Sequence, residues 1–150
     1  MSNLNFSING KSINPTLYQG QSRQFTLNVD EPETLGGKDI SANPVEYLLA
    51  GYAGCLNVVF NLVAKEKNIT LKELKINIDG DINPGKFLGF SETERAGFLS
   101  LNVHIQVDTD SSDLEVDDLI ETVKKRCPIN DNLTNPTPVN YFLTKKLDLN

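Results

Sequence analysis

Two cysteines, Cys55 and Cys127, are the residues of this chain best suited to carry out chemistry. A cysteine thiolate attacks electrophilic centres, and two thiols that meet can cycle between a reduced pair and a disulfide. In a reducing compartment two cysteines rarely form a structural staple. A zinc site of cysteine and histidine ligands cannot be completed either, because the chain has no CxxC motif and a single histidine, His104. We therefore expect no metal and no cofactor.

Cys55 lies in the segment Gly51-Tyr52-Ala53-Gly54-Cys55, inside a predicted helix. Two glycines within a helix cost about 1 kcal/mol each relative to alanine, so something must compensate for them. Close approach of another backbone, or space beside the thiol, would do so. The simpler interpretation is that Cys55 is a small core residue, because most buried cysteines behave in this way.

Cys127 is followed by Pro128, and proline is favoured at the first position of a helix. Cys127 is therefore a candidate cap for a new short helix, whose dipole would stabilise a thiolate. The preceding Lys124, Lys125 and Arg126 would add positive charge. Cys127 also ends the preceding helix, whose last carbonyl groups favour the neutral thiol. The sequence leaves the sign of the combined effect open.

The long helix that carries Cys55 is the most clearly predicted element. Asn43 is a good N-cap, Pro44 suits the first helical position, and Glu46 falls at the third, where it can complete a capping box. We expect the helix to reach about Lys67 and to be central and buried, because apolar groups cover most of its circumference. These apolar residues are Val45, Leu48, Leu49, Tyr52, Ala53, Leu56, Val59, Phe60 and Val63.

The remaining pattern predicts strands before and after this helix, then a second helix and a last strand. Alternating apolar residues indicate strands, and apolar residues at helical spacing indicate the second helix. This order is typical of an α+β fold with antiparallel sheets packed around helices. The expected strands involve Phe6 and Ile8, then residues 25–29, 74–78, 99–107 and 139–147; the expected helix covers 116–126, and loops cover 31–37, 83–85 and 135–138.

Composition and charge exclude several classes of function. The chain has 150 residues, of which 39% are hydrophobic and 23% charged, as expected for one soluble domain spanning residues 1–150. A formal net charge of −6 argues against nucleic acid as a partner. We expect no segment apolar enough to span a bilayer, and Met1 to Ser12 lacks the features of a secretory signal. These features predict a cytoplasmic protein without a membrane partner.

Two segments resemble the motifs of a known family. Residues 43–55, Asn-Pro-Val-Glu-Tyr-Leu-Leu-Ala-Gly-Tyr-Ala-Gly-Cys, resemble the N-P-x-E-x-L-L-A-A-x-x-G-C segment of OsmC-like proteins. Cys127-Pro128-Ile129 resembles their second motif, C-P-I/V-S. The segments 30–32 and 35–37 also look like the residues that precede the first motif in that family. The spacing of the cysteines and the order of the elements match over nearly the whole chain.

This resemblance to the OsmC/Ohr family implies a fold, a reaction and a set of partners. The implied fold is an intertwined homodimer with antiparallel six-stranded sheets around two central helices. The implied activity is a peroxiredoxin-like reduction of organic hydroperoxides, associated with stress response, in which Cys55 is the peroxidatic cysteine. Cys127 would be the resolving cysteine, which forms a disulfide with the oxidised Cys55. A dithiol, such as a lipoylated protein, would be the reductant.

The chain departs from the family pattern at two positions that activate the thiol in peroxidatic members. Val45 stands where those members have a glutamate, and Glu46 faces the opposite side of the helix from Cys55. The family arginine is not found in residues 14–20. Arg23 and Arg95 are the nearest candidates, and we expect both to be solvated. The sequence therefore resembles the less characterised OsmC-like branch more than the Ohr branch.

Two further interpretations follow from these departures. The chain is either a thiol-dependent hydroperoxide reductase, or an OsmC-fold protein that binds a small molecule or senses redox state without peroxidase turnover.

We expect His104 to be solvated or at an interface. The acidic cluster at Asp113, Glu115, Asp117 and Asp118 is expected to favour the dipole of the second helix rather than to bind a metal.

Overall fold

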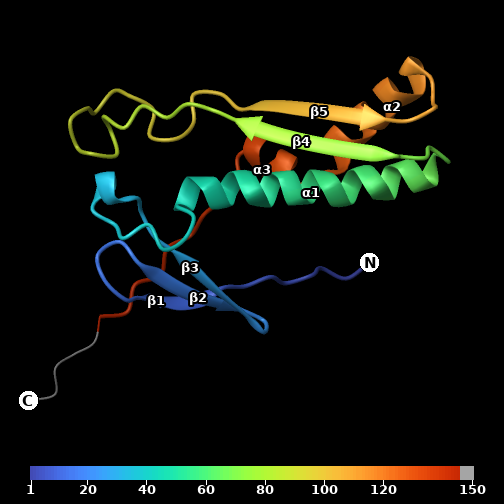
Figure 1. The fold of residues 1–150 in the computed structure, drawn as a ribbon. Coiled ribbons are helices and arrows are strands. Elements are labelled where there is room, and N and C mark those ends of the chain that lie inside the picture. The colour runs from blue at the N-terminus through green and yellow to red at the C-terminus, as the bar shows by residue number, and fades with distance from the viewer. Residues whose placement is uncertain (146–150) are drawn as a thin grey trace, which may run out of the picture.

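The computed structural model describes residues 1–145 and has a mixed α+β fold (Figure 1). This agrees with the fold class expected from the sequence. The elements in chain order are β1 (Asn9–Ser12), β2 (Tyr18–Ser22), β3 (Phe25–Val29), a short 3-10 turn (Glu33–Leu35), α1 (Pro44–Glu66), β4 (Glu73–Asp79), β5 (Asn102–Asp108), α2 (Asp113–Arg126) and α3 (Pro128–Thr134).

Helix α1 begins where the sequence predicted, because its first turn is capped in both directions. The Asn43 side chain accepts a hydrogen bond from the backbone N–H of Glu46 at 2.9 Å. The Glu46 carboxylate in turn accepts from the N–H of Asn43 at 2.8 Å. Pro44 occupies the first turn, where its missing N–H costs nothing. The helix ends at Glu66, and Lys67 is its C-cap.

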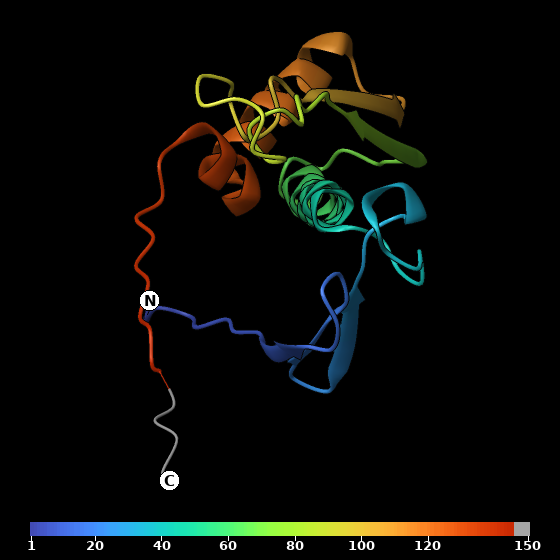
Figure 2. The ribbon, with the colours of Figure 1, turned by 90° about the vertical axis from the view of Figure 1, so that its left-hand side faces the viewer.

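The buried core lies between one face of α1, the β4–β5 hairpin and α2 (Figures 1 and 2). Strands β4 and β5 are antiparallel, with Ile76 opposite Ile105, and both alternate between half-buried and exposed residues. This alternation confirms the two predicted strands. The core residues are Tyr52, Leu56, Val59, Phe60, Val63, Ala64, Ile69, Leu119, Val123 and Cys127.

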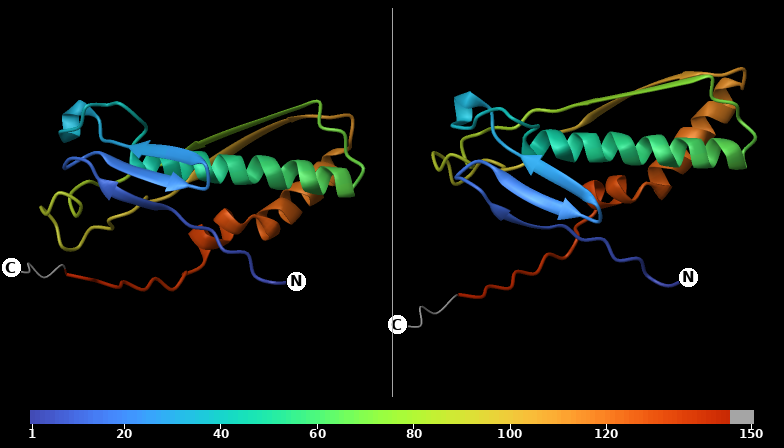
Figure 3. Two further views of the ribbon diagram at one scale, coloured as in Figure 1. Left: turned by 90° about the horizontal axis from the view of Figure 1, so that it is seen from below. Right: turned by 60° about the horizontal axis from the view of Figure 1, so that its bottom comes forward.

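The N-terminal strands form a separate antiparallel sheet in the order β1-β2-β3, on the other side of α1 from the hairpin (Figures 1 and 3). A hydrogen bond of 2.8 Å from the Tyr47 hydroxyl to the carbonyl oxygen of Asn28 links α1 to β3. Over residues 1–145 the sheets have three strands and two strands. The six strands implied by the family resemblance are therefore not assembled within this part of a single chain.

Two predicted strands are wrong within the described residues. Phe6 and Ile8 precede β1 and lie outside any strand, and residues 139–145 carry no strand either. Both segments extend away from the helices (Figure 3), and neither is paired. Alternation of side chains predicts which residues could face a core, but a strand also needs a partner for its backbone groups. Residues 146–147 of the predicted last strand lie outside the described residues.

Helix α1 also corrects the expectation that no segment is apolar enough to cross a bilayer. It has 23 residues, and its most apolar window of 18 residues has a mean hydropathy of 1.6. Length and composition alone therefore fit a membrane span. However, Phe60 and Val63 are fully buried against the rest of the core, as in the core helix of a globular fold.

Candidate active site

The structure brings Cys55 and Cys127 together, with 3.1 Å between their sulfur atoms. Both cysteines are reduced, and the thiol of Cys127 is placed to donate to the sulfur of Cys55. A disulfide has an S–S length of about 2.05 Å, so closing the bond requires the sulfurs to approach by only about 1 Å. Two thiols far apart in the sequence therefore share one site.

Cys127 lies at the junction of two helices and caps both. It is the C-cap of α2, and its N–H donates to the carbonyl oxygen of Val123 at 3.0 Å. It is also the N-cap of α3, where its sulfur accepts from the N–H of Asn130 at 3.4 Å and Pro128 follows. Both roles considered from the sequence are thus filled by the same residue.

The electrostatic setting keeps Cys127 in its thiol form. Burial raises its pKa, and the contact with Cys55 raises it further. The backbone N–H groups of Asn130 and Ile129 lower the pKa, but not enough to reverse the effect. Two of the preceding basic residues are paired elsewhere: Lys124 with Glu121 at 2.7 Å and Arg126 with Glu66. This settles the sign that the sequence left open, in favour of the neutral thiol.

Tyr52 and Asn130 border the sulfur pair, and sequence reasoning assigned neither to the site. Tyr52 lies one turn before Cys55 on α1, and only 7% of it is exposed. Its hydroxyl donates to Oδ1 of Asn130 at 2.6 Å. Burial raises the pKa of Tyr52, and negative charge on Cys127 or Cys55 raises it further. The three-residue spacing from Cys55 was a signal for Tyr52, since residues so spaced share a helix face.

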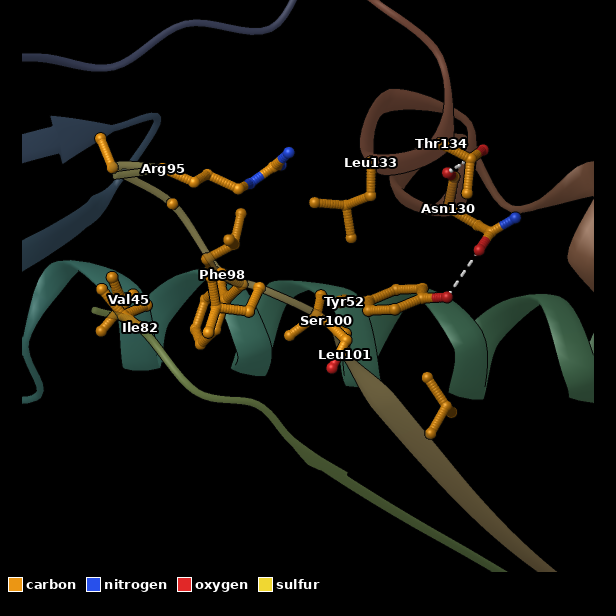
Figure 4. Close-up of a pocket in the computed structure, with 15 residues that line it drawn as sticks. Val45, Tyr52, Ile82, Arg95, Phe98, Ser100, Leu101, Asn130, Leu133 and Thr134 are labelled. Carbon is orange, nitrogen blue, oxygen red and sulfur yellow. Dashed lines mark hydrogen bonds between the residues drawn. The ribbon is translucent and has the colours of Figure 1, made fainter. Parts of the chain in front are cut away.

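A cavity of about 530 Å³ lies between α1, α3 and the loop before β5 (Figure 4), and its lining includes Tyr52 and Asn130 but neither cysteine. Tyr52 and Asn130 lie toward one end of it, and Arg95 lies toward the other, with its guanidinium reaching across in the direction of Leu133. Arg95 is exposed, as expected from the sequence, and its side chain also lines this cavity. The apolar residues of the lining are Val45, Leu48, Ile82, Ala96, Phe98, Leu99, Leu101, Val103 and Leu133.

The other candidate side chains from the sequence lie away from the sulfurs. Arg23, in the turn between β2 and β3, lies over the ring of Phe25 at 5.0 Å. His104 is exposed on β5, and its ring nitrogen is 2.9 Å from Asp79. Glu46 caps α1 as described above. Among residues 1–145, no guanidinium or carboxylate is hydrogen-bonded to either cysteine.

Two residues of the acidic cluster at the start of α2, Glu115 and Asp118, take part in capping and ion pairing. Glu115 and Ser112 form a capping box, and the hydrogen bonds from Ser112 lower the pKa of Glu115. Asp118 is paired with Lys67. In the described part of the chain, no group of three or more His, Cys, Asp or Glu residues is arranged to hold a metal ion.

Comparison with known proteins shows which family this chain resembles. A family model described as OsmC-like protein matches residues 36–142. A hydroperoxide reductase of Mycoplasma genitalium is 32% identical over 123 residues, which make up 81% of this chain and 81% of that protein. A hydroperoxide reductase of Mycoplasma pneumoniae is 30% identical over 112 residues, or 75% of this chain and 74% of that protein.

Solved structures agree with the fold. The crystal structure of an OsmC-like protein from Mycoplasma pneumoniae matches with a TM-score of 0.77 and 24% identity, over 90% of this chain and 91% of that chain. The family model covers more than two thirds of the sequence and includes both cysteines, and two relatives exceed or reach 30% identity over most of their length. This chain belongs to the OsmC-like protein family.

Proposed function

We propose that this protein reduces organic hydroperoxides through a two-cysteine cycle, with Cys55 as the attacking thiol and Cys127 as the resolving thiol. The observation that carries the proposal is the 3.1 Å separation of the two sulfur atoms. Relatives about 30% identical to this chain bear the name hydroperoxide reductase, which supports the same reaction class.

The reaction consists of two balanced steps. In the first, the thiolate of Cys55 attacks the terminal oxygen of the hydroperoxide, the O–O bond breaks, and an alkoxide leaves and takes up a proton to become an alcohol. Cys55 is then a sulfenic acid. In the second, the sulfur of Cys127 attacks the sulfur of Cys55, an S–S bond forms, and the hydroxyl group leaves as water. The peroxide gains two electrons, and the cysteine pair loses them.

Exposure and protonation support the roles that we propose for the two cysteines. Cys55 is half-buried and therefore more accessible to a peroxide, whereas Cys127 is fully buried. The raised pKa of Cys127 favours its thiol form, so Cys127 is the less reactive of the two towards a peroxide. The same difference in exposure directs the returning dithiol reductant to Cys55, because thiol–disulfide exchange depends on access to the sulfur under attack. A lipoylated protein is one such dithiol. The need for a steady supply of reductant leads us to propose a cytoplasmic location.

We extend the proposal to an intertwined homodimer, because a large apolar surface is left uncovered by residues 1–145 of this chain. On α1, the space beside Gly51 and Gly54 is open, and Val58 and Leu62 on the same face are 64% and 48% exposed. A second copy of α1 approaching the two glycines would compensate for their cost in the helix. Apolar side chains near the two ends are also exposed: Leu4, Phe6, Ile8, Val139, Tyr141, Phe142 and Leu143.

The same arrangement would supply the missing strands. Within residues 1–145, the three N-terminal strands have a free edge, and so does the β4–β5 pair. Pairing β1-β2-β3 with β4 and β5 of the partner and with the segment that includes residues 139–145 would make a six-stranded sheet. It would also give the unpaired backbone of that segment hydrogen-bond partners.

Purified protein supplied with an organic hydroperoxide and a dithiol tests the proposed reaction. We expect consumption of the peroxide, with one disulfide between Cys55 and Cys127 detected by mass spectrometry when the dithiol is omitted. Cys55→Ser should abolish consumption. Cys127→Ser should still react once and then stall with Cys55 oxidised. A wild-type protein that leaves the peroxide intact would refute the proposed function.

A further inference from the structure

The hydrogen bond between Tyr52 and Asn130 joins α1 to α3 directly beside the sulfur pair. The Tyr52 hydroxyl donates to Oδ1 of Asn130 at 2.6 Å, and the two residues are 78 positions apart in the chain. Tyr52 and Cys55 share a face of α1. Cys127 is the N-cap residue of α3, and its sulfur accepts the capping hydrogen bond. This contact therefore spans the same two elements as the sulfurs.

Three hydrogen bonds hold Asn130 in place, and one of them is made to the sulfur of Cys127. Its backbone N–H donates to the sulfur of Cys127 at 3.4 Å. Its side-chain amide donates to the carbonyl oxygen of Lys124 at 2.9 Å, in the last turn of α2. With the bond from Tyr52, Asn130 connects α1, α2 and the cap of α3. A shift of Asn130 would move the sulfur of Cys127 relative to Cys55.

We propose that Tyr52 and Asn130 form a clamp that holds Cys127 within reach of Cys55 for disulfide closure. The clamp is a positioning device: neither side chain exchanges atoms with the sulfurs. Its role in turnover rests on the proposed two-cysteine reduction, since it acts on the second step, in which Cys127 attacks oxidised Cys55 and water leaves. In that step the sulfur separation falls from 3.1 Å to about 2.05 Å.

The chemistry of the phenol suits this role. Burial raises the pKa of Tyr52, and a thiolate at either cysteine raises it further, so the hydroxyl keeps its proton and stays a donor while the sulfurs change charge. Tyr52 and Asn130 also line a second cavity of about 290 Å³, which extends along α1 to Phe60. The clamp therefore borders both cavities. Cys55 is half-buried, so slow closure would leave its oxidised form open to a second peroxide.

The test is Tyr52→Phe, with Tyr47→Phe as the matched control. Tyr47 also lies on α1 and loses an equivalent hydrogen bond, from its hydroxyl to the carbonyl oxygen of Asn28 at 2.8 Å, but it contacts β3 rather than α3. Single-turnover reactions with an alkyl hydroperoxide are quenched at intervals with a sulfenic-acid trap, and mass spectrometry resolves sulfenic acid, disulfide and sulfinic acid.

We expect Tyr52→Phe to lower the ratio of the closure rate to the Cys55 oxidation rate by about five- to tenfold, as for loss of one buried hydrogen bond. Sulfinic acid at Cys55 should rise with it. Tyr47→Phe should keep the wild-type ratio. Combining Tyr52→Phe with Asn130→Ala should close no more slowly than Asn130→Ala alone, because both changes break the same contact. An unchanged ratio in Tyr52→Phe, or an equal loss in Tyr47→Phe, overturns the proposal.

A second oxidant separates this proposal from the proposed function. Oxidised glutathione drives closure of the same disulfide without any peroxide. If the wild type consumes no hydroperoxide, the reductase proposal fails, but the glutathione reaction still compares the variants. A wild type that forms no Cys55–Cys127 disulfide with either oxidant overturns the clamp as well. Should Tyr52→Phe not fold, Asn130→Ala supplies the comparison with Tyr47→Phe.

Discussion

The two sides of α1 differ in how much of their structure one chain provides. On one side, β4, β5 and α2 enclose a core in which Phe60, Val63 and Leu119 are fully buried. On the other side, the N-terminal sheet buries only Gly20 along its three strands. The sulfur pair lies with the enclosed core. The difference teaches that one copy already sets the distance between the thiols, whereas the N-terminal sheet is left largely uncovered and open to the second copy that we propose.

Replacing a leucine in the enclosed core is the strongest way to test this contrast. Leu119→Ala should lower the free energy of unfolding by about 3–5 kcal/mol, because Leu119 is fully buried and its removal leaves a cavity. Urea unfolding followed by circular dichroism measures the change. Leu114→Ala, on the same helix but 79% exposed, is the matched control and should cost less than about 0.5 kcal/mol. Equal effects at the two positions would contradict the core described here.

A charge on the face of α1 that carries Val58 and Leu62 should separate the two proposed copies and leave the core of each copy folded. Leu62→Asp places a carboxylate where we propose that a second α1 packs, at a cost of roughly 2–4 kcal/mol per copy. Light scattering after gel filtration should show half the wild-type mass, and Leu114→Asp should leave the mass unchanged. The separated chain should still form the Cys55–Cys127 disulfide. A monomeric wild type, or a separated chain unable to close the bond, would contradict the division between the two sides.

The capping boxes of α1 and α2 allow a smaller comparison. Asn43→Ala removes the acceptor for the N–H of Glu46, and Ser112→Ala removes the acceptor for the N–H of Glu115. Each should lower the free energy of unfolding by about 1 kcal/mol. If the segment before α1 is held in place by the partner, Asn43→Ala should also weaken the dimer, measured by dilution in gel filtration, whereas Ser112→Ala should not.

Raising the pH above about 8.5 should change the free energy of unfolding least among these tests. The change should come from Cys127, which lies in the enclosed core. The pKa of Cys127 is raised in the folded protein, so the folded chain holds this proton more tightly than the unfolded chain. The resulting stability is fully present below the unfolded pKa of about 8.5 and is lost as pH rises through the higher folded value. Urea midpoints of the reduced protein should therefore fall above pH 8.5, and less so in Cys127→Ser. Identical profiles would contradict this source.

What could be predicted from the sequence was local. Asn43, Pro44 and Glu46 predict the start of α1, because the effects of all three on the helix terminus lie within one turn of the helix. The alternation that predicted β4 and β5 is also a property of consecutive residues. For α2, the apolar pattern indicated residues 116–126, whereas the helix begins at Asp113 because Ser112 and Glu115 cap it.

Contacts between distant segments could not be predicted in this way. The hydrogen bond between Tyr52 and Asn130 depends on how α3 packs against α1. The position of Arg95 at the cavity depends on how the loop before β5 packs against α1. No pattern of spacing carries that information. The meeting of the two cysteines was expected from the family resemblance alone. The strands expected near the ends were wrong because their partners are not within the described residues of one chain.

The double role of Cys127 restricts what can replace it. Whatever stands there must close α2 through its backbone and offer an acceptor to the amide of Asn130 at the head of α3. Serine satisfies both requirements, since a hydroxyl oxygen is among the favoured N-cap acceptors. Alanine provides no acceptor for that amide N–H. A mutagenesis series built on alanine would thus confuse a loosened helix junction with a missing nucleophile, and only the serine variant separates architecture from reactivity.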